Sequence, residues 1–313
     1  MQRISREQAH VYALDGSLEP VLRVTAGEAF AVETDDASSG LLTSGELAPT
    51  LENLPYARFT PAQANPVGGP VYVDGVAARG RIRVEIDEIT VADTGIWYNR
   101  PPISPLRDSQ EWPEGGEAFS EVVRHEGGEA TIGRLRWPLV PMIGTLACAP
   151  EWEMHSTTAG QGAFGGNLDV GDYQAGAAVY LTSYHEGGLV FVGDVHGCQG
   201  DGEWSSVADE SRAEVVLRAY PEPGDPLPAP RIVTPDRIVA LGIARPLEAA
   251  AREAIMHLLR WLVDELGFTR REAYLAVGLN PEFRIRVYQM TVAYSLDYVA
   301  GASLPRGFAG LSS

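Results

Sequence analysis

The stretch 188–203 reads GLVFVGDVHGCQGDGE. Its first residues are apolar, rich in β-favouring side chains and bounded by glycine, which is typical of a short buried strand. Alternate residues of an extended chain point to one side, so Asp194 and His196 are expected to face the same way where this strand ends. The glycine-punctuated loop that follows carries Asp201 and Glu203, which share a face if the chain there stays extended. The stretch therefore predicts a buried strand that delivers polar side chains to a site.

Strand patterns lie on both sides of this stretch. Residues 81–89 alternate apolar Ile82, Val84 and Ile86 with charged residues, which predicts a half-buried strand. Residues 137–150 form an apolar run broken by proline and glycine, which favours a buried crossing over a helix. Residues 96–128 are expected to form an irregular surface loop. Further strands are predicted at 22–26, 29–34, 71–76, 175–181 and 213–220.

Only the C-terminal part changes to a helical period. Apolar residues at three- and four-residue spacings predict a helix from Pro246 that Gly267 ends. Thr269 and Glu272 form a capping-box pattern that opens a second, shorter helix. The expected fold is mainly β, with sandwich- or barrel-like sheets and a small C-terminal α/β part that contains two helices. A proline-rich connector at 221–230 divides a β-rich catalytic region, 1–225, from a helix-containing region, 226–313, that packs on it as one structural unit.

The charge composition argues against two classes of binding partner, nucleic acids and anionic membranes. The 313 residues include 42 acidic and 24 basic side chains, for a formal net charge of −18. Nucleic-acid binding needs a basic face and anionic membranes repel such a chain, so neither partner is expected. The two cysteines, Cys148 and Cys198, form no C-x-x-C pair, and a disulfide framework is not expected. Residues 1–8 have no leader-like apolar region and no run reaches the length of a membrane span, so the expected location is the cytoplasm.

The chemistry centres on Asp194-x-His196, which fits either metal ligands or a hydrogen-bonded pair that closes a turn. Flanking glycines and the second acidic pair favour the metal interpretation. One histidine among several carboxylates suits a borderline or hard divalent ion. Cys198 could serve as a nucleophile, but no base partner is evident and a small buried residue fits it better. Serine catalysis has no G-x-S-x-G support.

Taken together, the sequence resembles the acetamidase/formamidase family. The resemblance rests on five segments in chain order: Glu33-Thr34 with Asp36; Asn65-Pro66-Val67 with Gly69-Pro70 and Asp74-Gly75; Met142-Ile143-Gly144 to Ala149-Pro150; Phe164-Gly165-Gly166-Asn167-Leu168-Asp169; and Gly193-Asp194-Val195-His196 through Gln199-Gly200-Asp201-Gly202-Glu203. The C-terminal part is similar as well, but Val277-Gly278-Leu279 stands where a serine-containing segment is expected.

The resemblance implies hydrolysis of a short carboxamide, such as formamide or acetamide, on a mainly β fold, and a homo-oligomer. The expected cofactor is a divalent metal ion, Zn²⁺ or Ca²⁺, that lowers the pKa of a bound water and polarises the carbonyl. Glu203 is the candidate general base and later acid, and Asp201 is a second candidate catalytic carboxylate. Asn167, or the Gly165–Gly166 backbone, is expected to orient the amide. The residues expected to hold the metal are Asp36, Asp169, Asp194 and His196.

Two other interpretations stay open. A β-rich binding module could use the acidic loops to hold a structural Ca²⁺, because oxygen ligands at loop ends suit that ion. An amidase-like protein that has lost its activity is the third possibility, given the altered segment 277–279. Release of ammonia from an amide separates the first interpretation from these two.

Overall fold

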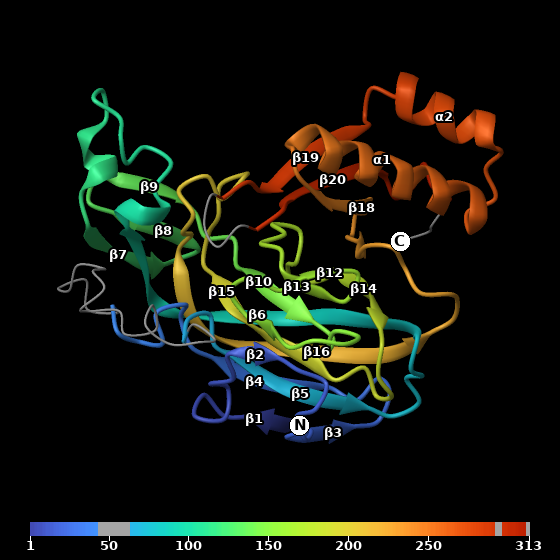
Figure 1. The fold of residues 1–313 in the computed structure, drawn as a ribbon, viewed down its shortest axis with the longest axis horizontal. Helices are drawn as coiled ribbons and strands as arrows, with labels where there is room; N and C mark the ends of the chain where they lie inside the picture. Colours follow the sequence, from blue (N-terminus) through green and yellow to red (C-terminus); the bar gives the residue numbers. More distant parts are fainter. Residues whose placement is uncertain (43–62, 292–295, 311–313) are drawn as a thin grey trace.

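The structure, a computed structural model, describes residues 1–42, 63–291 and 296–310. These residues form a large, mostly antiparallel sheet and two helices (Figure 1). The strands are β1 (Gln2–Ile4), β2 (Ala13–Leu14), β3 (Leu22–Val24), β4 (Phe30–Thr34), β5 (Val67–Val73), β6 (Gly80–Asn99), β7 (Phe119–Glu126), β8 (Glu129–Ile132), β9 (Leu135–Pro138), β10 (Met142–Ala147), β11 (His155–Ser156), β12 (Gln161–Gly162), β13 (Gly165–Asn167), β14 (Ala178–Ser183), β15 (Val190–His196), β16 (Glu210–Glu222), β17 (Arg231–Val233), β18 (Arg237–Ala244), β19 (Arg284–Gln289) and β20 (Tyr298–Pro305). The helices are α1 (Leu247–Asp264) and α2 (Arg270–Leu279), with short 3₁₀ turns at Pro101–Ile103 and Pro113–Gly116.

The mainly β fold with two C-terminal helices is confirmed. Strand β6 contains the alternating segment 81–89, and its inward side chains Ile82, Val84 and Ile86 are buried in the main core. It pairs with β16 over most of that strand's length and with β14 on its other side. The paired strands β6 and β16 run side by side through the centre of the molecule in Figure 1.

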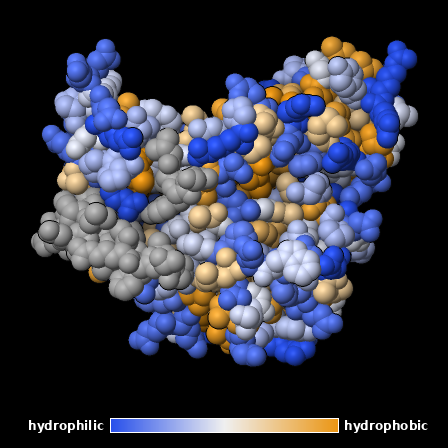
Figure 2. Space-filling model, viewed as in Figure 1, coloured by the Kyte–Doolittle hydropathy of each residue, from blue (hydrophilic) through white to orange (hydrophobic). Residues whose placement is uncertain are grey.

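The expectation of an irregular loop over 96–128 is confirmed for residues 100–118 and wrong at both ends. Strand β6 continues to Asn99, and residues 94–99 pair with β7. Strands β7, β8 and β9 follow as a three-stranded arm that projects from the body of the molecule (Figure 1). This pairing joins residues about twenty-five positions apart, and a local reading of the sequence cannot detect such a register. Figure 2 shows the surface dipping between the arm and the helical C-terminal part.

The strand in the central stretch is longer than expected. Strand β15 does not end before Asp194 but runs on to His196, and all seven of its residues are buried. Within the apolar run 137–150, residues 142–147 form β10, a fully buried strand between β13 and β15, in line with the expected non-helical crossing. Residues 137–141 are only partly buried or exposed, so the expected burial is not met there. The neighbouring strands β13, β10 and β15 therefore bring distant parts of the sequence side by side.

The C-terminal helices pack on β18 and β20 through a second hydrophobic cluster that includes Leu258, Leu262 and Leu304. Helix α1 follows Pro246, which serves as its N-cap residue. The predicted capping box is present, with Thr269 and Glu272 bonded reciprocally. Beyond the proline-rich connector, β17 pairs with β14. Neither helix is long and apolar enough to cross a membrane, nor is any other helical segment in the described residues.

The contact between β18 and α1 depends on a glycine. A Cβ atom at Gly242 would lie 2.1 Å from the Ala250 carbonyl oxygen and 2.5 Å from the Ala254 amide nitrogen. We therefore expect Gly242→Ala to lower the free energy of unfolding by about 1–3 kcal/mol, because the helix must move off the strand. The control is Gly278→Ala within α2, where a Cβ meets nothing within 4 Å; it should be neutral or stabilise by up to about 1 kcal/mol. Urea unfolding measures both, and equal midpoints for the two variants would contradict the close packing.

Candidate functional site

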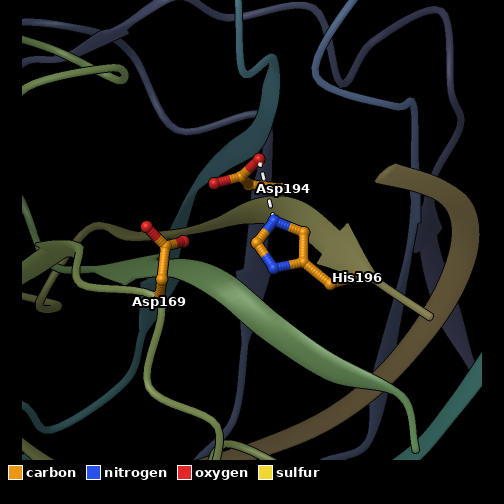
Figure 3. A group of neighbouring side chains, drawn as sticks. All are labelled: Asp169, Asp194 and His196. Atoms are coloured by element: carbon orange, nitrogen blue, oxygen red, sulfur yellow. Dashed lines mark ion pairs between the residues drawn. The ribbon is translucent and has the colours of Figure 1, made fainter. Parts of the chain in front are cut away.

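Three of the four predicted metal ligands lie together. Asp169, Asp194 and His196 are buried, and each offers a ligand atom within 4.8 Å of the others. The side chains point toward one another (Figure 3), with Asp194 Oδ1 3.6 Å from His196 Nε2. Asp194 and His196 come from β15, and Asp169 follows β13. The expectation that Asp194 and His196 face the same way is met in the structure.

Strand β10 lies between the strands that carry these residues and leaves room for them with a glycine. A Cβ atom at Gly144 would lie 2.6 Å from Asp169 Oδ1 and 2.8 Å from Asp194 Oδ2. The Gly144 carbonyl also accepts the Asp169 backbone N–H at 3.2 Å. Any larger residue at this position would push the two carboxylates apart.

Hydrogen bonds fix the orientation of the His196 ring. The Gln199 amide donates to the carbonyl oxygens of Asp169, at 2.7 Å, and Tyr288, at 3.2 Å. Its Oε1 therefore faces His196 and accepts a hydrogen bond from Nδ1 at 2.8 Å. A proton on Nδ1 leaves the lone pair of Nε2 directed at the carboxylates. This is the arrangement in which histidine binds a metal ion.

Two further buried carboxyl groups complete the cluster. Glu210 starts β16 opposite His196 in the strand register, and its Oε2 lies 3.5 Å from His196 Nε2. Glu203 is 8% exposed and lies within hydrogen-bonding reach of Asp169. Asn65 and Thr145 donate to Asp194 Oδ2 at 3.0 and 3.2 Å.

The cluster has the properties of a cation site. Among the described side chains, Asp169 Oδ1, Asp194 Oδ1 and Glu210 Oε2 are fully buried acceptors without a hydrogen-bond donor. Buried acceptors without a partner are costly, and several carboxylates together are more so. They surround a cavity of about 30 Å³, which exceeds the space that one water needs. The residues present therefore fit a bound divalent ion.

The pKa values follow from this crowding. Burial, and then the charge of Asp194, raise the pKa of Asp169 to about 7. Burial, and then the charge of Asp169, raise the pKa of Glu203 well above its usual range. Burial disfavours the charged His196 ring, but the Glu210 and Asp194 carboxylates outweigh it and raise the pKa of His196 well above its ordinary value. A bound cation would favour the ionised carboxylates and the neutral imidazole.

The backbone is strained at the same place. Within the described ranges, eight residues other than glycine have a positive φ, and five of them line this cavity. Such backbone conformations cost about 1–3 kcal/mol each and gather at functional sites. The five are Asn65, Asp169, Asp194, Glu203 and Ser206.

Two predicted residues lie outside the cluster. Asp36 is buried but does not line this cavity. Its Oδ1 accepts hydrogen bonds from the Ser38 hydroxyl and N–H and from the Gly40 N–H, which close a turn, and its buried Oδ2 has no hydrogen-bond donor among the described residues. Asp201 is 59% exposed and pairs with Arg286 at 2.6 Å. Residues 200–203 form a turn rather than extended chain, so Asp201 and Glu203 do not share a face.

The residues expected to orient an amide have different surroundings. Asn167 lines the cavity; its Nδ2 donates to the Thr158 carbonyl at 3.1 Å, and its buried Oδ1 has no donor among the described residues. Gly165 and Gly166 have positive φ, and Cβ atoms there would lie 2.2 and 1.9 Å from backbone carbonyl oxygens. Close packing therefore accounts for both glycines.

Sequence reasoning missed the role of Glu210 as a cluster member and of Gln199 as the partner of His196. Glu210 belongs to no short motif, and its pairing with His196 appears only once β15 and β16 are in register. The spacing of three residues between His196 and Gln199 was visible, but the hydrogen bond depends on the turn between them. Arg100, which also lines the cavity, follows β6 in the segment expected to be an irregular loop.

One family model matches part of the chain. The acetamidase/formamidase family model matches residues 156–219, a segment that holds Asp169, Asp194, His196, Glu203 and Glu210. A comparison with curated protein sequences finds no match.

Solved structures match the whole chain. An acetamidase from Bacillus halodurans has a TM-score of 0.86 and 26% identity, covering 99% of this chain and 100% of that one. An acetamidase from Yersinia enterocolitica has a TM-score of 0.85 and 27% identity, covering 98% of this chain and 92% of that one. A predicted acetamidase/formamidase from Thermoanaerobacter tengcongensis has a TM-score of 0.85 and 24% identity, covering 100% of this chain and 99% of that one. These matches confirm the resemblance to the acetamidase/formamidase family and its β-rich fold.

The close fit at Gly144 gives a test of the site that needs no enzyme assay. We expect Gly144→Ala to weaken Zn²⁺ binding by about 10–100-fold, because the added methyl group separates Asp169 from Asp194. Gly200→Ala is the matched control, since a Cβ there meets nothing within 4 Å. Equilibrium dialysis with Zn²⁺ measures both variants. Equal affinities for the two would show that these carboxylates do not hold the ion.

Proposed function

We propose that this protein hydrolyses a small carboxamide to a carboxylate and ammonia at the cluster around His196. The observation that carries the proposal is the convergence of three buried carboxylate oxygens, none with a hydrogen bond, and a ring nitrogen on one buried cavity. Similarity to acetamidases supports the reaction class.

We further propose that a divalent ion binds to Asp169, Asp194, His196 and Glu210. Glu210 replaces Asp36 in this ligand set because Glu210 lines the cavity, with Oε2 3.5 Å from His196 Nε2, and Asp36 does not line it. An imidazole ligand favours Zn²⁺ over Ca²⁺, which takes oxygen ligands. Such an ion supplies a Lewis acid and lowers the pKa of a bound water.

The protein's own groups would then move the protons and hold the substrate. As a water oxygen bonds to the carbonyl carbon, the Glu203 carboxylate takes its proton; when the C–N bond breaks, Glu203 returns that proton to the nitrogen. The free Oδ1 of Asn167 is suited to accept an N–H from the carboxamide. The Arg100 guanidinium, on the same cavity, would stabilise the oxyanion. The reaction consumes one amide and one water and releases a carboxylate and ammonium.

Ammonia release tests the reaction and the metal together. We expect purified protein to release ammonia from formamide, acetamide or propionamide, to lose this activity on chelation, and to regain it with Zn²⁺. Activity that withstands complete removal of metal would remove the ion from the mechanism but keep the amidase. No ammonia from any amide, with Zn²⁺ bound, would overturn the proposed function and favour a binding module.

The role of Glu203 has a matched control on the same loop. We expect Glu203→Gln to lower kcat by about 10²–10⁴-fold, because the amide cannot carry the proton. Asp201→Asn removes a carboxylate that is exposed and paired with Arg286, and kcat should change less than about threefold. Steady-state kinetics on acetamide compares the two. A Glu203→Gln enzyme with full turnover would exclude this residue as the base.

A further inference from the structure

A second, larger cavity of about 710 Å³ adjoins the cluster. It lies between the arm of β7, β8 and β9 and the loop 197–209. Its walls are mainly apolar, and side chains from both sides contribute: Trp97, Val123, Ile132, Trp137, Val140 and Trp204. Small-molecule sites in proteins are commonly about 300–1,000 Å³ and lined by apolar and aromatic side chains.

The aromatic wall is held in place. The Trp97 indole N–H donates to the Val207 carbonyl oxygen at 3.2 Å, so its one polar atom is satisfied within the protein. Its ring packs against Phe119 with centroids 5.5 Å apart. The backbone of Trp137 is held by the β8–β9 pairing, opposite Ala130. A wall built in this way offers a flat apolar surface with no unpaired indole N–H at Trp97.

The two cavities meet at Glu203. This carboxyl lines both the small cavity at the cluster and the large aromatic cavity. Gln199 lines the large cavity and bonds to the ring of His196. A carboxamide held beside Glu203 would therefore extend its substituent toward Trp204, the next residue, and Trp137. Acetamide, which has only a methyl group there, would leave this space unused.

We propose that the aromatic cavity is an acyl subsite and that the preferred substrates are primary carboxamides with an aryl or similarly flat apolar substituent. This inference rests on the proposed amidase function and names its substrate class. Contact with an aromatic ring provides both apolar burial and ring–ring attraction. The substituent takes no part in bond making or breaking, so the reaction stays the same hydrolysis.

The test compares phenylacetamide with acetamide. We expect kcat/KM to be at least about tenfold higher for phenylacetamide. In Trp137→Ala the ratio of the two kcat/KM values should fall about tenfold, and in Trp204→Ala it should fall as well. The control is Trp112→Ala, since Trp112 is 62% exposed and lies outside the cavity; there the ratio should not change. A ratio near one in the unaltered enzyme, or a ratio unmoved by both cavity substitutions, would overturn the subsite.

Binding separates failure of the subsite from failure of the amidase proposal. We expect calorimetry with Glu203→Gln to show binding of phenylacetamide that Trp137→Ala weakens about tenfold in the same background. If no amide is hydrolysed but this binding is seen, the amidase proposal fails and the cavity remains a site for flat apolar ligands. If acetamide is hydrolysed and phenylacetamide does not bind, the amidase proposal stands and the subsite is wrong.

Discussion

Burial of carboxylates without enough positive charge is the constraint on which this structure depends. Asp169, Asp194, Glu203 and Glu210 are each 8% exposed or less, and the basic residues on their cavity are His196 and Arg100. Removing an ion from water costs on the order of several kcal/mol even after the protein relaxes. The raised pKa values of Asp169 and Glu203 express this cost. The divalent ion proposed for this site would offset it, which gives a physical reason for four acids inside the fold.

The sheet meets this constraint by bringing distant strands together. Strands β13, β10 and β15 lie side by side, and Gly144 leaves the space in which two carboxylates approach each other. Strand β16 adds Glu210 from the other side of β15. From the C-terminal part, β19 contributes Gln289, whose amide donates to Asp169 Oδ2. Five strands therefore define one small volume, and none of them could do so alone.

Patterns among neighbouring residues predicted several of the strands and both helices. Alternation in 81–89 predicted part of β6, helical spacing predicted α1, and the Thr269 capping box predicted the start of α2. Glycine-flanked Asp194-x-His196 indicated a pair of ligand atoms, and the structure brings the two residues together. The arm of β7, β8 and β9, and the place of Glu210, depend on strand register, which a single sequence does not display. Asp36 and Asp201 are acidic residues in turns, and composition alone cannot distinguish such residues from members of a buried cluster.

The contact between the end of β19 and the loop that carries Glu203 also bears on how the protein is made. Met290, the residue after β19, donates its N–H to the Gly202 carbonyl oxygen at 2.7 Å. Met290 leaves the ribosome long after β15, which carries the proposed ligands Asp194 and His196. Other bonds to this loop come from earlier segments, such as the one that Trp97 donates to the Val207 carbonyl oxygen, but the bond from Met290 can form only after the later segment has been made. The proposed ligands Asp194 and His196 are thus made before the segment that contacts this loop, so binding of an ion and ordering of the loop can be separate events in the biogenesis of the protein.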